Sequence, residues 1–250
     1  MTRWTDVVKG LARRLGVDVR RYSVQGSPDG QLARLLSRLR AELVLDVGAN
    51  EGQYARALRR IGYRGRIVSF EPLSSAHARL VLTARGAVGW IIAPRMALGE
   101  TEGEVLLHVA GNSVSSSILE MLPEHERAAP GSAYVASEIV RLARLDRVAA
   151  THAETAGAVL LKMDAQGYED HVLAGASGIL DRIVAIQTEL SLVPLYAGQP
   201  LFQDMGRRLD ALGFGLHALF PGHVDQDTGR TLQVDGFFVR RDLAAGRGLP

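Results

Sequence analysis

Short apolar runs alternate with amphipathic segments along most of this sequence, and that alternation limits the folds the chain can adopt. The apolar runs have the length of buried strands, and the segments between them repeat apolar residues at helical spacing. Such alternation predicts an α/β fold, a doubly wound and mostly parallel sheet with helices on both faces. We expect strands within 43–47, 66–72, 88–99, 158–164 and 182–190, and helices over 54–61, 74–84, 168–180 and 202–212.

Four segments lie outside this alternation. Residues 104–110 have the pattern of a further short strand, whereas residues 112–140 are expected to be irregular or partly helical. Residues 213–220 and 234–240 are expected to be two closing strands joined by a polar turn. No internal repeat or low-complexity linker interrupts the chain, so we expect a single domain. The domain is expected to span 1–250, with N-terminal helices within 1–40 and an α/β core over 41–240.

The N-terminal extension begins with a basic amphipathic helix. Its apolar residues recur at helical spacing, and four basic residues lie between them: Trp4, Val7, Val8, Leu11, Ala12 and Leu15, with Arg3, Lys9, Arg13 and Arg14. Such a helix either packs on the domain, where it can cover a pocket, or contacts a membrane surface. A loop then leads to a second amphipathic helix at Leu32–Leu39.

Composition excludes several classes of protein. The absence of cysteine rules out disulfides, thiolate catalysis and cysteine-based zinc sites. A formal charge of only +2 gives no reason to expect a nucleic-acid partner. No run of about 18 apolar residues could span a membrane. Charged residues interrupt the N-terminus, so no secretory leader is expected and a cytoplasmic protein is the default.

Acidic residues stand at the ends of four predicted strands: Asp46, Glu71, Asp164 and Glu189. In doubly wound sheets the ligand binds outside the carboxyl ends of the strands. Because like charges repel, four carboxylates at one edge are costly unless a ligand compensates them. A cationic or hydroxyl-rich ligand would do so.

The loop after the first strand contains Asp46, Gly48, Asn50 and Gly52. It lacks the G-x-G-x-x-G pattern of nicotinamide-binding proteins, and its acid would repel a pyrophosphate. Gly48 is expected to let the backbone approach a ligand, and Glu71 to accept hydrogen bonds from ribose hydroxyls. A nucleoside with a cationic tail fits both acids, which points to S-adenosylmethionine. The alternatives are a general nucleotide loop, or glycines that serve only the turn.

Lys162 lies inside an apolar strand and needs a partner there. Strand alternation places Asp164 on the same face, and Glu189 ends the expected neighbouring strand. The cluster is either a structural ion pair or a polar network that positions a substrate hydroxyl. His171, on the following helix, is a further candidate base.

Several stretches together resemble the FkbM family of S-adenosylmethionine-dependent O-methyltransferases: LVLDVGANEGQYARALR, IVSFEP, ALGE, NSVSSSIL, LLKMDAQGYEDHVLAGA and IQTELSLVPLY. The resemblance covers roughly Val24 to Arg240. It implies a class I methyltransferase (Rossmann-like) sheet with an antiparallel last strand, and methylation of a hydroxyl on a sugar, a glycolipid or a polyketide. It implies these cofactor contacts: Asp46, Gly48, Asn50, Gly52 and Glu71, with Ser116 near the cofactor or acceptor. Many members have glutamate at the position of Gln166, which leaves Asp164 as the candidate base.

The expected reaction is displacement of a methyl group by an alcohol oxygen, for which a base or a metal must help remove the proton. Asp164 is the first choice for that base, with Glu189 and Lys162 as its partners. Alternatively, both carboxylates hold Mg²⁺. The expected partner is a small-molecule or glycolipid acceptor. Two other classes stay open: a Rossmann dehydrogenase, and a catalytically silent S-adenosylmethionine-binding or assembly protein.

Overall fold

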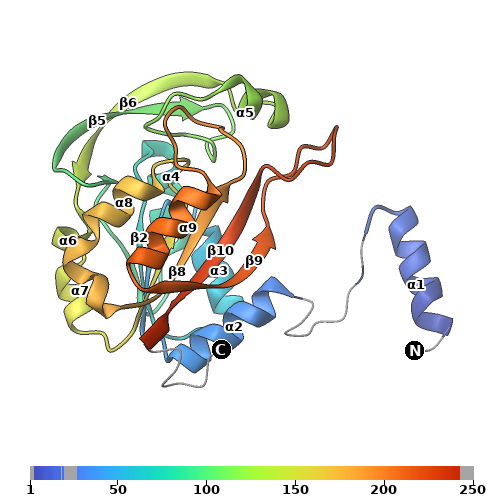
Figure 1. Ribbon diagram of the computed structural model, residues 1–250, viewed down its shortest axis with the longest axis horizontal. Coiled ribbons are helices and arrows are strands. Elements are labelled where there is room, and N and C mark those ends of the chain that lie inside the picture. Colours follow the sequence, from blue (N-terminus) through green and yellow to red (C-terminus); the bar gives the residue numbers. More distant parts are fainter. Residues whose placement is uncertain (1–2, 18, 20–26, 243–250) are drawn as a thin grey trace.

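The computed structural model describes residues 3–17, 19 and 27–242, and its centre is a seven-stranded sheet (Figure 1). The strand order is β3-β2-β1-β7-β8-β10-β9. The first five strands of this order run parallel, and β10 is antiparallel to both of its neighbours. The alternating sequence therefore folds as predicted, antiparallel closing strand included. The bounds are β1 Leu43–Val47, β2 Arg66–Phe70, β3 Trp90–Ile92, β7 Val159–Met163, β8 Ile183–Ser191, β9 Phe214–Pro221 and β10 Gln233–Arg240.

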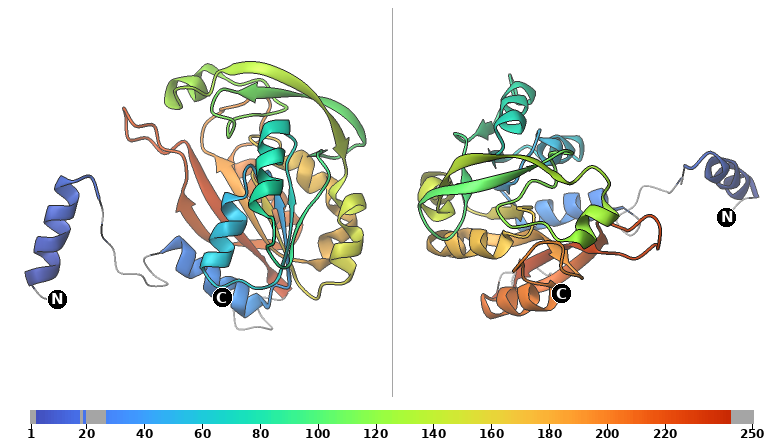
Figure 2. Two further views of the ribbon diagram at one scale, coloured as in Figure 1. Left: turned by 180° about the vertical axis from the view of Figure 1, so that it is seen from behind. Right: turned by 90° about the horizontal axis from the view of Figure 1, so that it is seen from above.

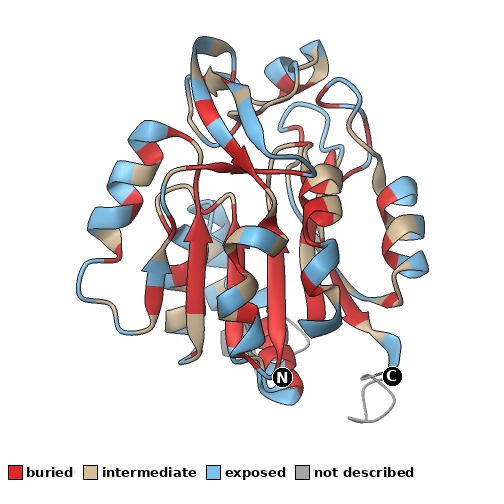
Figure 3. Ribbon diagram, turned by 90° about the vertical axis from the view of Figure 1, so that its left-hand side faces the viewer, coloured by how far each residue is buried: buried red, intermediate tan, exposed pale blue. Residues whose placement is uncertain are grey.

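Helices cover both faces of the sheet and bury two apolar cores. One core joins Val44 of β1 to the helices α2, α3 and α4. The other joins Leu43 and Leu45 to α6, α7, α8 and α9. Successive residues of β1 thus enter opposite cores, as strand geometry requires, and Figure 3 shows the central strands buried along their length. The bounds are α2 Pro28–Leu39, α3 Gln53–Arg60, α4 Ser74–Thr83, α6 Leu145–Val148, α7 Ala150–Glu154, α8 Glu169–Gly175 and α9 Phe202–Ala211.

A second sheet crosses above the carboxyl ends of the central strands (Figures 1 and 3). It consists of β4 (Ala97–Leu98), β6 (Tyr134–Ala143) and β5 (Gly103–Ala110), in that order. The chain between β5 and β6 carries the short helix α5 (Pro123–Ala128). The expectation of irregular structure up to residue 140 was wrong over β6. Much of that strand is exposed on both faces, so its sequence lacks the apolar alternation of a half-buried strand.

Helix boundaries were predicted less well than strand positions. The helix expected over 168–180 is divided into α8 and a 3₁₀ segment, Ser177–Arg182. Helix α2 has clear end signals: the Ser27 hydroxyl accepts a hydrogen bond from the Gly30 amide, and Pro28 starts the first turn.

Helix α1 (Arg3–Arg14) stands away from the α/β body, as Figures 1 and 2 show. The structure therefore does not place it over a pocket, which was one expectation for it. Among the described residues, no helix is long and apolar enough to cross a membrane.

Candidate functional site

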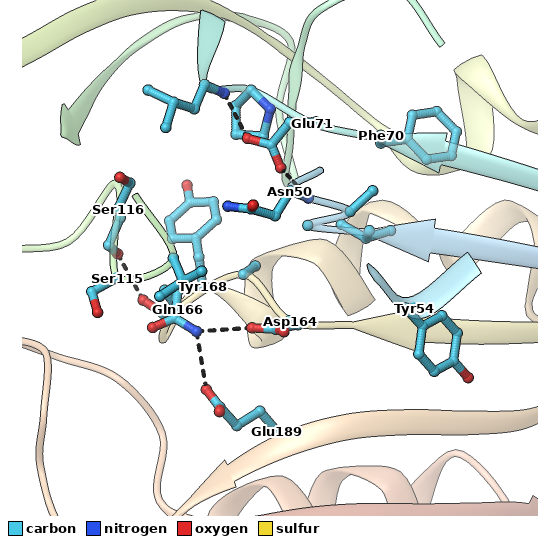
Figure 4. A pocket seen from close by; sticks show the side chains of 18 of the residues that line it. Asn50, Tyr54, Phe70, Glu71, Ser115, Ser116, Asp164, Gln166, Tyr168 and Glu189 are labelled. Atoms are coloured by element: carbon cyan, nitrogen blue, oxygen red, sulfur yellow. Dashed lines mark hydrogen bonds between the residues drawn. The ribbon is translucent and has the colours of Figure 1, made fainter. Parts of the chain in front are cut away.

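A cavity of about 750 Å³ opens at the carboxyl ends of β1, β2, β7 and β8, and residues of the second sheet also line it. The strand order reaches β2 on one side of β1 and β7 on the other, which is the switch point where doubly wound folds bind ligands. The loops after these strands, the 112–118 segment and strand β10 all contribute to its wall. Figure 4 shows this wall from close by.

Glu71 follows β2 and lines the cavity, and both of its carboxylate oxygens accept hydrogen bonds from the backbone. Its Oε2 accepts a hydrogen bond from the Asn50 amide at 2.7 Å, and its Oε1 accepts one from the Leu73 amide at 2.8 Å (Figure 4). Burial raises the pKa of Glu71 to about 7, although these two backbone hydrogen bonds oppose the rise. Each oxygen retains a further lone pair, so the side chain can accept hydrogen bonds from a diol.

The loop after β1 is joined to the 112–118 segment through Asn50. Asn50 has a left-handed backbone with φ of 45°, lines the cavity, and lies 3.5 Å through Nδ2 from the Ser113 hydroxyl. Ser116 also lines the cavity, but its hydroxyl accepts a hydrogen bond from the Ala110 amide at 3.0 Å. This hydrogen bond helps to hold the 112–118 segment, which forms part of the cavity wall.

The two glycines of this loop are required by protein contacts. Gly48 has φ of 72°, and a Cβ there would lie 1.8 Å from the carbonyl oxygen of Asp164. Gly52 has φ of 88°, and a Cβ there would lie 2.6 Å from the indole of Trp90. Gly48 lines the cavity, whereas Gly52 does not. Close approach of the Gly48 backbone to a ligand stays a prediction, and the structure adds a close approach of Gly48 to the loop after β7.

Asp46 lies beneath the cavity and does not line it. It is fully buried, accepts a hydrogen bond from the Ser69 hydroxyl at 3.0 Å, and lies 3.3 Å from the ammonium of Lys162. Lys162 stands directly opposite Asp46 in the β1–β7 pairing. The positive charge that faces Asp46 is therefore Lys162, which corrects the expectation that Asp46 contacts a cationic ligand directly.

Lys162 connects this buried acid to the cavity. Its Nζ donates to the carbonyls of Val47 at 3.2 Å and Gly48 at 2.9 Å, and lies 3.6 Å from Oδ2 of Asp164. Burial works against its charge, but Asp46 and Asp164 outweigh burial and raise the pKa of Lys162 above its usual value. Lys162 therefore holds the loop after β1 and Asp164 in fixed relation.

Asp164 is the more accessible of the two candidate catalytic acids, with 41% of its side chain exposed. Gln166 Nε2 donates to Asp164 at 2.8 Å and to Glu189 at 3.3 Å, so the amide bridges the two carboxyl groups (Figure 4). Burial, and then the neighbouring Asp164, raise the pKa of Glu189 well above its usual value. Asp164 lines the cavity with a partly exposed carboxyl group, and is therefore the better placed of the two acids to contact a ligand.

The far wall of the cavity contains polar residues that the sequence did not single out. Tyr54 on α3 donates to Gln187 at 2.5 Å, and Gln233 on β10 donates to Glu189 at 2.6 Å. Asp235 pairs with Glu189 across β10 and β8, and burial raises its pKa to about 6. The sequence carried little signal for Gln233 and Asp235, because strand β10 follows β9 in the chain but inserts between β8 and β9.

His171, the other candidate base, lies outside the lining of this cavity. Its ring is stacked on Tyr168, and its Nδ1 lies 3.1 Å from Glu100 on the protein surface. The structure therefore gives His171 no position from which to contact a ligand in the cavity.

The metal alternative finds no support. Within the described parts of the chain, no group of three or more His, Cys, Asp and Glu side chains is placed to hold a metal ion. Asp164 and Glu189 are instead joined by the Gln166 amide, a hydrogen-bond donor.

Residues 46–216 match the model of the methyltransferase FkbM domain. The chain belongs to the FkbM methyltransferase family. The matched range contains all the strand-end acids of the cavity, and the membership confirms the resemblance seen in the sequence. It supports an S-adenosylmethionine-dependent methyltransferase. A comparison with curated proteins finds no match.

Several solved structures are similar to this FkbM chain, at low sequence identity. Magnesium protoporphyrin IX methyltransferase from Synechocystis PCC 6803, with bound SAM, has 11% identity and a TM-score of 0.43, over 96% of this chain and 98% of that one. A TehB-like SAM-dependent methyltransferase from Corynebacterium glutamicum has 13% identity and a TM-score of 0.41, over 95% and 96%. TehB from Haemophilus influenzae has 8% identity and a TM-score of 0.44, and the match covers 85% of this chain but only 62% of that one.

Proposed function

We propose that this protein transfers a methyl group from S-adenosylmethionine to a hydroxyl of a sugar, a glycolipid or a polyketide-type acceptor. The observation that carries the proposal is the half-exposed Asp164 carboxylate, held by Lys162 and Gln166 inside the cavity that also contains Glu71. A base and a nucleoside-binding acid thus share one cavity. S-adenosylmethionine supplies the electrophilic methyl group, bonded to a sulfonium.

The residues around Glu71 fit such a cofactor. Its carboxylate oxygens suit the two hydroxyls of a ribose, as acids at this position do in related folds. Leu73, Met96 and Leu98 add apolar surface to the same cavity, which suits an adenine ring. Asn50 and Ser116 stand in the loops that border it. We assign cofactor binding to this part of the wall.

The opposite part of the wall suits a hydroxyl-rich acceptor. Carboxyl and carboxamide groups from the loop after β7 and from β8 and β10 line it, and they can form hydrogen bonds with hydroxyls: Asp164, Gln166, Gln187, Glu189, Gln233 and Asp235. Asp164 accepts the proton of the attacking hydroxyl, which makes the oxygen a better nucleophile. Lys162 and Gln166 keep that carboxylate oriented. Positioning of acceptor and cofactor in one cavity supplies a further part of the rate.

The proposal is tested by titrating the purified protein with S-adenosylmethionine and with NAD, followed by mass spectrometry of glycolipids and secondary metabolites from a deletion strain. The expected results are binding of S-adenosylmethionine alone and loss of one methyl group from a specific metabolite. Binding of NAD would favour a dehydrogenase. Binding of S-adenosylmethionine with an unchanged metabolite profile would favour a silent binding protein.

Cofactor affinity is expected to depend on pH through Glu71. Its pKa is about 7 in the free protein, and only the ionised form accepts hydrogen bonds from two hydroxyls. Affinity should therefore fall roughly tenfold from about pH 8 to about pH 6, because the proton competes with the ligand. Glu71→Ala should lower affinity at least about tenfold at the higher pH and remove the part of the pH dependence that is due to Glu71. Calorimetry at several pH values measures both effects.

The same raised pKa has the opposite effect on the stability of the free protein. Burial makes the folded state hold the Glu71 proton more tightly than the unfolded state does. Its contribution to stability therefore falls as pH rises from about 4.5 to about 7. Glu51 provides a control, because Glu51→Ala removes a partly exposed carboxylate from the loop after β1, outside the cavity lining. Equal affinity in Glu71→Ala and the parent would remove Glu71 from the binding site.

A further inference from the structure

Helix α1 exposes an apolar face that the α/β body does not cover. Its apolar side chains have large exposed fractions: Val7 65%, Val8 52% and Leu11 63%, followed just after the helix by Leu15 at 77%. All three views place the helix away from the rest of the molecule (Figures 1 and 2). None of its described side chains lines the large cavity. An exposed apolar face of this kind indicates a site that binds a protein or a membrane.

The charges on α1 indicate which kind of partner binds this apolar face. The helix holds four basic residues and one acidic residue, a formal charge of +3, whereas the whole chain carries only +2. The rest of the chain therefore sums to −1, and the net positive charge of the protein is concentrated in α1. At 100° per residue, Lys9 and Arg13 lie opposite Val8, Leu11 and Leu15, and Arg14 lies at the border of the apolar face.

We propose that α1 binds the surface of an anionic lipid bilayer. The helix lies parallel to the membrane, with Val7, Val8 and Leu11 in the interface and its basic side chains at the lipid phosphates. A 12-residue helix is about 18 Å long, too short to cross the hydrocarbon core but suited to lying along it. Long cationic side chains at the border of the apolar face can reach the headgroups while their methylenes stay in apolar surroundings.

Charge complementarity favours an anionic membrane over a second copy of this chain. The rest of the chain sums to only −1 and offers little net attraction to a helix of +3. An anionic bilayer offers both an apolar layer and a continuous negative surface, which attracts clustered basic residues within a Debye length. This inference does not depend on methyl transfer, since it concerns binding of the protein to lipid alone.

Flotation of the full chain with vesicles tests the proposal. We expect the protein to float with vesicles made of equal parts of phosphatidylglycerol and phosphatidylcholine, and to float at least about tenfold less with phosphatidylcholine alone. Leu11→Gln keeps the charge and removes one apolar anchor, so it should lower binding roughly tenfold. Gly10→Gln is the matched control, because a side chain there meets no atom within 4 Å and lies on the polar face. It should bind as the parent does.

Each contrary result counts against a stated part of the proposal. Equal flotation on both vesicle types would overturn the role of the basic residues, and equal loss in Leu11→Gln and Gly10→Gln would overturn the role of the apolar face. Absence of parent flotation on anionic vesicles would overturn the proposal as a whole, and would favour docking of α1 on protein. Melting curves for each variant should match the parent, since α1 stands away from the core.

Discussion

Asp164→Asn is expected to lower kcat at least about 100-fold, because the amide cannot accept the proton of the acceptor hydroxyl and loss of a general base costs about 10²–10⁴ in rate. Affinity for S-adenosylmethionine should stay within about threefold of the parent, since Glu71 and the loop after β1 remain. Calorimetry of cofactor binding and single-turnover methyl transfer to the acceptor, measured on the same preparation, separate the two effects.

Asp181→Asn is a suitable control for this substitution. Asp181 has 75% of its side chain exposed and is paired with Arg182 outside the large cavity. The same chemical change there should leave both cofactor affinity and rate unaltered. A single-turnover rate of Asp164→Asn within about threefold of the parent would show that Asp164 is not the base.

Lys162→Met is expected to destabilise the fold by about 3–5 kcal/mol, because it leaves Asp46 fully buried without its opposite charge. The same variant loses the hydrogen bonds to the carbonyls of Val47 and Gly48, which hold the loop after β1. Urea unfolding at constant pH measures the change in the free energy of unfolding. A loss below about 1 kcal/mol would contradict a buried ion pair at this place.

The double variant Lys162→Met, Asp46→Asn separates charge pairing from packing. Asp46→Asn keeps the shape of the side chain and removes the charge that Lys162→Met leaves behind. If the two residues form a pair, the double variant should be more stable than Lys162→Met alone, with a coupling energy of about 0.5–3 kcal/mol. Additive losses would mean that Asp46 and Lys162 act independently.

The sequence predicted the sheet well because each of its central strands carries a local pattern. Apolar runs such as LVLDV end in an acid and a glycine-rich loop, and the helices that follow repeat their apolar residues at helical spacing. The antiparallel closing strand followed from the family resemblance. The same patterns brought Glu71, Asp164 and Glu189 to one cavity, since carboxyl ends of parallel strands meet at one edge.

Sequence patterns did not predict elements that are largely exposed, or contacts between strands that are distant along the chain. Strand β6 is largely exposed on both faces, so its sequence carries no apolar alternation for a sequence-based prediction to detect. Gln233 and Asp235 reach the cavity only because β10 inserts next to β8. Helix α1 was correctly predicted as amphipathic, but its separation from the body depends on contacts that no periodicity describes.

The partner of Lys162 shows most clearly where local pattern ends and tertiary structure begins. Strand alternation determined by itself that Lys162 and Asp164 share a face, because side chains two residues apart point the same way. It could not determine which residue of β1 stands opposite Lys162, since register is a property of two strands brought together from distant parts of the chain. The tertiary structure pairs Lys162 with Asp46, and so converts an expected ligand contact into the buried ion pair that positions Asp164.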